Sequence, residues 1–322
     1  MEEKEEDEQN LMQQQDKLIY RKHAIIKNLI ISGGGPAGLA FYGSLKTMNQ
    51  LGMWKLDNIQ HIYGTSIGAI LAFTLALNYD WNEIDDFIIK RPWHKIFKVD
   101  LPTIINAIEN KGMYNRSILN DILKPLLFGK DLSLDITLQE FYQKTKVHCH
   151  FITMKLKSIE SLDISDITHP NWKLLDAIYC SIALPICFSP FYYENDYLCD
   201  GGFISNYPVE FCIQDGHSAD ETIGVGFVFA LDRNKDANIV LKEENKSEEE
   251  YHSYNLFDYM IELLINLIRN SNNKRNKISL YKEILLNPKN PKFHDMYNII
   301  HSQESRSELI KYGEQIANKL CI

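Results

Sequence analysis

The sequence predicts an α/β fold with a mostly parallel central sheet. The segment 29–32 is short, apolar and β-branched, which is typical of a strand buried in a parallel sheet. A second strand candidate, 59–63, follows after a helical segment, 38–51, that is long enough for a crossover connection. Strand, helix and strand in this order indicate a parallel βαβ unit.

Glycine-rich turns follow both strands. Three glycines, 33–35, come directly after the first strand, and the next helix would point its amino-terminal N–H groups toward them. The second strand runs into the turn 64–68, which reads Gly-x-Ser-x-Gly and opens the helix 67–77. Small residues around Ser66 would leave its hydroxyl clear of the backbone, as in a nucleophile elbow.

The two turns are expected to lie side by side. In a parallel sheet with right-handed crossovers, both would emerge at the same carboxyl edge. Ester cleavage needs a nucleophile and fixed N–H donors about 3 Å from the developing oxyanion. Gly33, Gly34 and Gly35 could supply these donors, because a chain without Cβ atoms can approach a substrate oxygen closely.

Asp200 is the candidate base. It ends the short strand-like run 197–199 and precedes two glycines, so its carboxylate meets little backbone crowding. A carboxyl group with an ordinary pKa of about 3.9 is a weak base for a serine hydroxyl. Hydrogen bonding and a dry site would have to raise its basicity.

Composition restricts the classes of function. The 322 residues are 45% hydrophobic, enough for one large α/β domain with an appendage. The net charge of −9 argues against nucleic-acid binding. No basic and apolar leader opens the chain, and no apolar run approaches the roughly 18 residues of a membrane span. We therefore expect an intracellular, cytoplasmic protein that contacts membranes only peripherally. The cysteines lack CxxC spacing, which fits reduced, buried thiols: Cys149, Cys180, Cys187, Cys199, Cys212 and Cys321.

The chain divides into four predicted regions. An acidic tail, 1–22, is too poor in apolar residues to fold. The main domain spans 23–231, a charged linker 232–254, and a helical region 255–322, in which we expect only helices. Within the main domain, short helices and loops that lie over the sheet, in place of a sheet strand, are expected over 92–129, where they could cover a greasy substrate. Further strand candidates are 147–153, 186–191 and 221–231.

His148 and His150 would share one face of the strand 147–153. A His-x-His pair can bind metal, but no third ligand lies nearby at a metal-motif spacing. We interpret the pair as two polar residues on a strand face and predict no metal site.

Four segments together resemble the patatin-like phospholipase family. They are the glycine loop 33–38, the turn 64–68, the Ser-x-Ala-x-Pro segment within 180–185, and Asp-Gly-Gly at 200–202. The resemblance covers residues 26–231. It implies a three-layer α/β/α sandwich with additional C-terminal helices, and hydrolysis of lipid acyl esters by a Ser–Asp dyad without a catalytic histidine, metal or cofactor.

The resemblance also assigns residues. Ser66 becomes the nucleophile, Asp200 the base, and Gly33, Gly34 and Gly35 the oxyanion hole. The other motif glycines would support these groups: Gly38, Gly64, Gly68, Gly201 and Gly202. One position departs from the pattern, because this chain has Ala37 where many members have arginine. The charge that this arginine would bring to the mouth of the site is absent.

Two other readings of the motifs remain. The glycine loop also resembles the start of a flavin-binding Rossmann domain, but that fold needs an acidic residue at the tip of the second strand, and Asp57 lies before that strand. A lipid-binding protein that has lost activity is a further alternative, which only an assay can exclude. A Ser-His-Asp enzyme would place histidine after the acid, and His217, the one such histidine in the family-like region, lies in a polar turn that we expect to be exposed.

The segment 255–269 predicts an amphipathic helix. Its polar residues form a narrow stripe and the rest is apolar; a basic cluster of Lys274, Arg275 and Lys277 follows. Such a helix can dock on an anionic bilayer. We favour the alternative, a helix packed on the main domain with its stripe facing water. The stripe consists of Asn255, Asp258, Glu262, Asn266 and Arg269.

Overall fold

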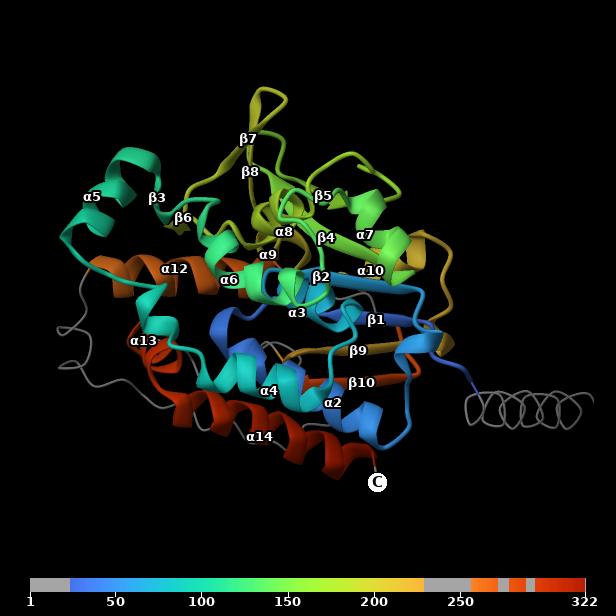
Figure 1. Ribbon diagram of the computed structural model, residues 1–322. Coiled ribbons are helices and arrows are strands. Elements are labelled where there is room, and N and C mark those ends of the chain that lie inside the picture. Colours follow the sequence, from blue (N-terminus) through green and yellow to red (C-terminus); the bar gives the residue numbers. More distant parts are fainter. Residues whose placement is uncertain (1–23, 229–255, 272–277, 288–292, 322) are drawn as a thin grey trace, which may run out of the picture.

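The computed structural model describes residues 24–228, 256–271, 278–287 and 293–321 (Figure 1). The predicted tail, the predicted linker and the basic cluster 274–277 lie outside the described residues. Helices flank a central sheet, and further helices follow at the C-terminal end of the chain, which confirms the predicted fold class.

The sheet is mixed and mostly parallel. Its strand order is β10-β9-β1-β2-β4-β8-β7, with β5 paired to β4 beside this path. Neighbours from β10 to β4 run parallel, whereas β8, β7 and β5 are antiparallel to their partners. The strands are β1 (Asn28–Ile31), β2 (His61–Thr65), β4 (His148–Lys155), β5 (Glu160–Ile164), β7 (Phe191–Tyr193), β8 (Asp196–Asp200), β9 (Thr222–Phe227) and β10 (Lys282–Leu286).

The predicted βαβ unit is present. Strand β1 leads through the short helix η1 (Gly35–Gly38) into α2 (Leu39–Gln50), and β2 leads into α3 (Ile67–Ala76). The register pairs Ile31 with Gly64. Both glycine-rich turns therefore leave the sheet at one carboxyl edge, as predicted.

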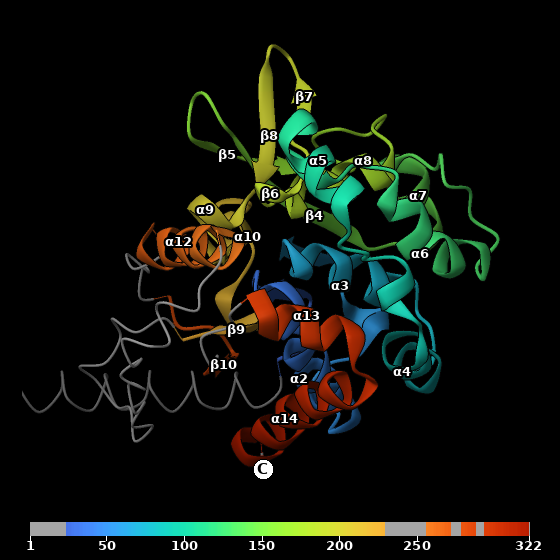
Figure 2. The ribbon, with the colours of Figure 1, turned by 90° about the vertical axis from the view of Figure 1, so that its left-hand side faces the viewer.

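Apolar side chains of the strands form a core on each face of the sheet. The larger core takes Leu29, Ile31 and Ile62, and the smaller one takes Ile30 and Tyr63, as expected from the alternation of side chains along a strand. Figure 2 shows α9, α10 and α12 on one side of the sheet and α3, α6 and α8 on the other. The bounds of the helices not yet described are α6 (Ile118–Phe128), α8 (Leu174–Ile182), α9 (Gly202–Ser205), α10 (Val209–Gln214) and α12 (Leu256–Ser271).

Shorter elements complete the chain. The region 92–129 holds the expected helices and adds no strand to the main sheet, but it contains β3, which pairs with β6 in a separate two-stranded sheet that the sequence analysis did not predict. The bounds are η2 (Leu56–Asn58), α4 (Trp81–Lys90), η3 (Trp93–Lys95), α5 (Leu101–Asn110), β3 (Gly112–Tyr114), α7 (Leu138–Thr145), β6 (Ile186–Phe188), η4 (Ala219–Glu221), α13 (Phe293–His301) and α14 (Gln303–Cys321).

The expectation of helices alone after residue 255 is also wrong. Residues 282–286 form β10, which extends the sheet by pairing with β9. Its Lys-Glu-Ile-Leu-Leu sequence suits a helix equally well, and pairing with a buried neighbour decides its conformation. The C-terminal region thus contributes a strand to the sheet that carries the two glycine-rich turns.

Helix α12 packs on the domain but turns its apolar side outward. Ile261 is buried, while Leu256 and Tyr259 are exposed. Of the polar stripe, Asn266 is exposed, whereas Asp258, Glu262 and Arg269 are half-buried. The favoured alternative is therefore correct for the packing, and the stripe faces water only in part. Among the described residues, no helix is long and apolar enough to cross a bilayer.

Helix α14 lies in close contact with α2. The Ser44 hydroxyl on α2 donates to the Gly313 carbonyl on α14 at 3.0 Å. Lys46 on α2 forms ion pairs with Asp85 at 2.6 Å and Glu314 at 3.1 Å, joining α2, α4 and α14. A Cβ atom added at Gly313 would lie 1.9 Å from the carbonyl oxygen of Ala40. Glycine is therefore needed at this crossing of two helices.

We predict that Gly313→Ala destabilises the whole domain. The methyl group would force α14 away from α2, which should cost about 2 kcal/mol or more and lower the melting temperature by roughly 5 °C. Thermal unfolding followed by circular dichroism measures the change. The control is Gln315→Ala, an exposed site on the same helix. Equal melting temperatures for Gly313→Ala and the parent protein would contradict this packing.

Candidate active site

Ser66 lies at a strained turn between β2 and α3. Its backbone has φ 56° and ψ −121°, a conformation that L-residues rarely adopt. The Ser66 N–H donates to the Ser181 hydroxyl at 3.0 Å, and that hydroxyl donates to the carbonyl of Ile152 at 2.7 Å. The Ser-x-Ala-x-Pro segment thus holds the predicted nucleophile through Ser181.

The glycines on either side of Ser66 permit the sharp turn. A Cβ atom at Gly64 would lie 2.3 Å from the Gly68 carbonyl oxygen, and one at Gly68 would lie 2.2 Å from the Ile31 carbonyl oxygen. The turn can therefore fold over the end of β1 only when both positions lack side chains. This agrees with the geometry expected of a nucleophile elbow.

Asp200 ends β8 and faces Ser66. Its residue surface is only 3% exposed. The carboxylate accepts hydrogen bonds from the Ser66 hydroxyl and from the Gly202 N–H, the latter at 2.8 Å. Burial raises the pKa of Asp200 to about 6, although both hydrogen bonds lower it. The structure therefore brings together the predicted nucleophile and the predicted base.

The glycine loop is anchored by Asn206. The Gly33 N–H donates to the Asn206 carbonyl at 2.8 Å, and the Asn206 side-chain amide donates to the Gly33 carbonyl at 3.1 Å. Ser32 joins this network through hydrogen bonds of 3.0 Å with the side chain and the carbonyl of Asn206. The sequence predicts no role for Asn206, because its contact with a residue 173 positions earlier leaves no local signal.

Because Asn206 anchors the loop, the three predicted oxyanion residues differ in whether their backbone N–H groups already have a hydrogen-bond partner. The Gly33 N–H is already bonded to Asn206. The N–H groups of Gly34 and Gly35 make no hydrogen bond within the described part of the chain. Gly35 has φ +52° and lines the same cavity as Ser66. The oxyanion role stays a prediction, with Gly34 and Gly35 as the available donors.

An apolar cavity of about 260 Å³ extends from Ser66. Its walls come from α3, from the segment between α4 and β3, and from α13. Nearly all of the lining side chains are hydrocarbon or aromatic, among them Leu39, Ile70, Phe97, Met113, Phe188 and Ile300. The region 92–129, predicted as a cover for a greasy substrate, thus supplies one wall.

Arg306 fixes the α13 wall of this cavity. Its guanidinium is buried and donates to the carbonyls of Ile299 and Ile300 at the end of α13, at 2.9 and 2.7 Å. It also donates to the Ile89 carbonyl on α4 at 2.7 Å. A cation at a helix C-terminus interacts favourably with the exposed carbonyls. Helix α13, which lies beyond the region of the sequence motifs, is therefore held firmly against α4.

The histidines lie apart from the dyad or have other partners. His217 lies against His61 with ring centroids 4.0 Å apart and is half-buried. The rest of its turn, Asp215, Gly216 and Ser218, is exposed as expected. His61 begins β2, so it lies roughly 16 Å from Ser66 at about 3.3 Å per residue. His301 lines the cavity, and its Nδ1 atom lies 2.8 Å from the Tyr297 carbonyl.

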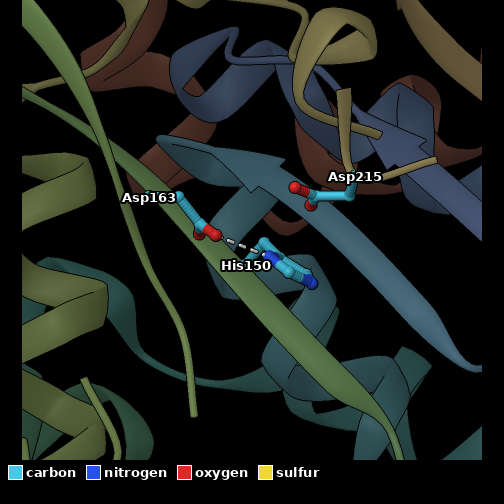
Figure 3. A group of neighbouring side chains, drawn as sticks. All are labelled: His150, Asp163 and Asp215. Carbon is cyan, nitrogen blue, oxygen red and sulfur yellow. Dashed lines mark hydrogen bonds and ion pairs between the residues drawn. The ribbon is translucent and has the colours of Figure 1, made fainter. Parts of the chain in front are cut away.

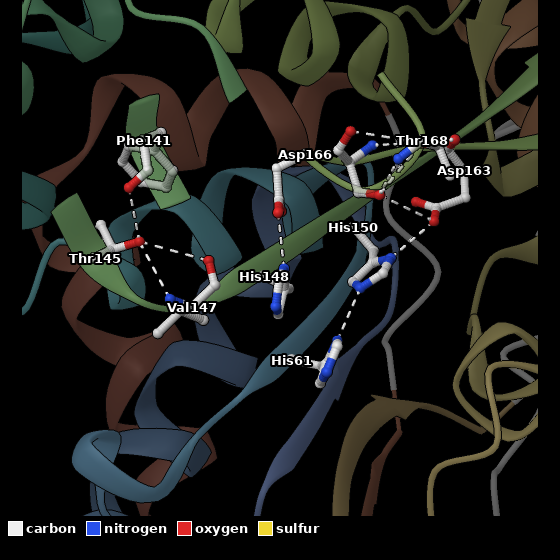
Figure 4. Close-up of polar contacts among 10 residues, drawn as sticks. His61, Phe141, Thr145, Val147, His148, His150, Asp163, Asp166 and Thr168 are labelled. Atoms are coloured by element: carbon white, nitrogen blue, oxygen red, sulfur yellow. Dashed lines mark hydrogen bonds and ion pairs between the residues drawn. The ribbon is translucent and has the colours of Figure 1, made fainter. Parts of the chain in front are cut away.

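His148 and His150 share one face of β4, as predicted. His148 Nδ1 lies 2.8 Å from Asp166, and His150 Nδ1 lies 2.8 Å from Asp163 (Figure 4). Each imidazole thus has a carboxylate partner, His150 from Asp163 within β5 and His148 from Asp166 just after that strand. This group lies at the amino ends of β2 and β4, whereas Ser66 follows the carboxyl end of β2.

The sequence model of the patatin-like phospholipase family matches residues 29–213, more than half of the chain. The chain belongs to this family. Patatin-like phospholipases are lipid acyl hydrolases, and the flavin-binding alternative falls away with the assignment. In agreement, β2 ends at Thr65 and leads into Ser66 without an acidic residue at its tip.

Individual relatives are distant. An uncharacterized protein of Acanthamoeba polyphaga mimivirus is 27% identical over 76% of this chain and 77% of its own length. A probable lipid hydrolase of Invertebrate iridescent virus 6 is 25% identical over 58% of this chain and 63% of its own. A cGAMP-activated phospholipase of Vibrio cholerae is 25% identical over 57% of this chain and 55% of its own.

We predict that the activity of this patatin-like phospholipase falls in acid with an apparent pKa of about 6. If Asp200 is the base, as the sequence predicts, only its ionised form can accept the Ser66 proton, and burial raises its pKa to about 6. At pH 5 roughly a tenth of Asp200 is ionised, so the rate should be about a tenth of its plateau. Measurement of kcat/KM on a short-chain ester from about pH 5 to about pH 8 tests this. A rate that stays constant over that range would contradict it.

Proposed function

We propose that this patatin-like phospholipase hydrolyses fatty acyl esters through an acyl-enzyme formed on Ser66, with Asp200 as the general base. One observation carries the proposal: the hydrogen-bonded Ser66–Asp200 pair lies at the end of an apolar cavity. A nucleophile joined directly to a buried base has the arrangement needed for acyl transfer.

The reaction proceeds in two balanced steps. Asp200 takes the Ser66 proton while Ser66 Oγ bonds to the ester carbonyl carbon, and the protonated Asp200 then returns the proton to the departing alcohol oxygen. Water next attacks the acyl-enzyme, with Asp200 accepting its proton and passing it to Ser66. The products are a free fatty acid and an alcohol or lysolipid, and Asp200 and Ser66 return to their starting states.

The N–H groups of Gly34 and Gly35 stabilise the oxyanion in this proposal. Support comes from their position beside Ser66 and from the hydrogen bonds that Asn206 makes to Ser32 and Gly33, which fix the loop. Fixed donors are more effective than mobile ones because they need no reorganisation during the reaction.

The cavity favours a long acyl chain as the group transferred to Ser66. Its lining offers hydrocarbon contacts along most of its surface and few polar partners. Arg306, the one lining cation among the described residues, has four backbone carbonyls as partners.

The dyad proposal predicts the ranking of three variants. Ser66→Ala should lose turnover and labelling by a fluorophosphonate probe, because the attacking oxygen is absent. Asp200→Asn should lower kcat by roughly a thousandfold or more, as expected when a general base is removed. His217→Gln should keep most of the activity, because His217 lies at the opposite edge of the sheet.

Ester hydrolysis and probe labelling are measured on all three proteins, with circular dichroism to confirm folding. Full labelling of Ser66→Ala would exclude Ser66 as the nucleophile. Greater loss in His217→Gln than in Asp200→Asn would exclude the dyad. An inactive parent protein that still binds lipid would favour the lipid-binding alternative.

We further propose that the face around α5, α12 and α13 contacts the lipid surface. Both views place these helices on the same side of the molecule (Figures 1 and 2). Ile108 on α5 is 79% exposed and Leu256 on α12 is 67% exposed, and Val99, which lines the cavity, is exposed beside α5. Exposed apolar residues around a cavity mouth are typical of an interfacial binding surface. The other exposed apolar residues here are Leu101, Ile105, Tyr259, Leu263, Leu267 and Tyr297.

We predict that Ile108→Asp and Leu256→Asp together weaken binding to lipid vesicles by at least tenfold in flotation, because charge opposes insertion into the interface. Hydrolysis of a soluble short-chain ester should stay unchanged, which separates this proposal from the dyad. The matched control is Ile25→Asp, a 58% exposed apolar residue at the amino edge of the sheet. Equal loss of binding in the control would show that this face is not the contact.

A further inference from the structure

A second polar cluster lies at the sheet edge opposite Ser66. Strands β2 and β4 pair His61 with His148 and Tyr63 with His150 at their amino ends. The face that carries these side chains is the one covered by α10, since Tyr63 belongs to the core that contains Val209 and Cys212 of that helix. The proposed hydrolysis uses none of these groups.

Three residues of this cluster converge from separate segments (Figure 3). His150 lies on β4, Asp163 near the end of β5, and Asp215 directly after α10. One ligand atom from each lies within 4.8 Å of the other two. The closest pair is His150 Nδ1 and an oxygen of Asp163, 2.8 Å apart. A third ligand could not be recognised near the His-x-His pair from sequence, because the carboxylates come from distant positions.

Asp163 has an unused oxygen. Its Oδ2 atom faces His150, while its Oδ1 atom is buried and has no hydrogen-bond partner among the described residues. Leaving a buried carboxylate oxygen unpartnered costs about 1–3 kcal/mol or more. A ligand that satisfies this oxygen would remove that cost.

We propose that His150, Asp163 and Asp215 bind one divalent cation of the zinc or manganese class. An imidazole nitrogen and two carboxylate oxygens suit these ions. With bonds of about 2.1 Å, neighbouring ligand atoms around one ion lie about 3.4 Å apart. The His150–Asp163 pair, at 2.8 Å, would have to open slightly, and separations of up to 4.8 Å would have to close. Asp215 is exposed, which gives the ion access from solvent and leaves room for water to complete its coordination.

Neighbouring side chains already orient the three ligands. His150 Nε2 lies 3.1 Å from His61 Nδ1, so a hydrogen on Nε2 leaves the Nδ1 lone pair free for an ion. The Tyr63 ring stacks on His150 at 4.0 Å, and its hydroxyl donates to Asp215 at 2.6 Å. Groups that hydrogen-bond to ligands commonly fix their orientation in metal sites. The ion would join β4, the end of β5 and the segment after α10, and would act on stability and not on the chemistry at Ser66.

The adjacent pair His148 and Asp166 provides an internal control. It has the same residue types, the same strand face and the same 2.8 Å separation. No third ligand group was found around His148 in the described residues, whereas His150 has two carboxylates. Substitutions in the two pairs should therefore affect metal binding very differently.

Calorimetric titration of EDTA-treated protein with Zn²⁺ and with Mn²⁺ tests the proposal. The parent protein should bind one equivalent of at least one of these ions and melt at a higher temperature in its presence. Asp215→Asn, at an exposed position that can still accept from Tyr63, should weaken that binding at least tenfold and abolish the rise in melting temperature. Asp163→Asn should do the same.

His148→Gln and Asp166→Asn should bind the ion as tightly as the parent protein. The proposal is overturned if the parent protein binds neither ion stoichiometrically, or if Asp166→Asn weakens binding as much as Asp215→Asn. Ester hydrolysis plays no part in these readouts, so failure of the metal site and failure of the Ser66–Asp200 dyad remain distinguishable.

Discussion

The parallel pairing of β1 with β2 is the constraint on which the site depends. It places the ends of both strands, Ile31 and Gly64, side by side, so that the glycine loop and the turn at Ser66 leave the sheet together. The turn then crosses β1 so closely that Gly68 cannot carry a side chain. A second parallel pairing, of β2 with β4, brings His61 next to His148 and Tyr63 next to His150 at the other edge. Strand β2 therefore takes part in both the proposed catalytic edge and the proposed metal-binding edge.

Burial of Asp200 links stability to the proposed chemistry. The folded protein holds this carboxyl at a pKa of about 6, above its value of about 3.9 in an unfolded chain. Its contribution to stability is therefore complete below about pH 4 and is lost as pH rises through 6, so the ionised form opposes folding. Packing around the dyad offsets this cost, and the C-terminal helices α13 and α14 contribute to that packing and to the wall of the cavity.

Local sequence patterns predicted the strands and turns whose conformation depends mainly on neighbouring residues in the chain. The strands β1, β2 and β4, the turn at Ser66 and the Asp-Gly-Gly end of β8 all carry their signals within a few residues. Long-range contacts could not be predicted in this way. Strand β10 forms because β9 offers a partner, Asn206 reaches Gly33 across the fold, and Asp163 and Asp215 approach His150 from separate elements.

The most direct test of the proposed mechanism is a crystal structure of the protein inactivated by a long-chain alkyl fluorophosphonate. The account predicts a covalent bond from phosphorus to Ser66 Oγ and a phosphoryl oxygen within hydrogen-bond distance of the Gly34 and Gly35 N–H groups. The alkyl chain should fill the cavity between α3 and α13, next to Ile70 and Ile300. A phosphoryl oxygen that points away from the glycine loop, or a chain that leaves the cavity empty, would contradict it.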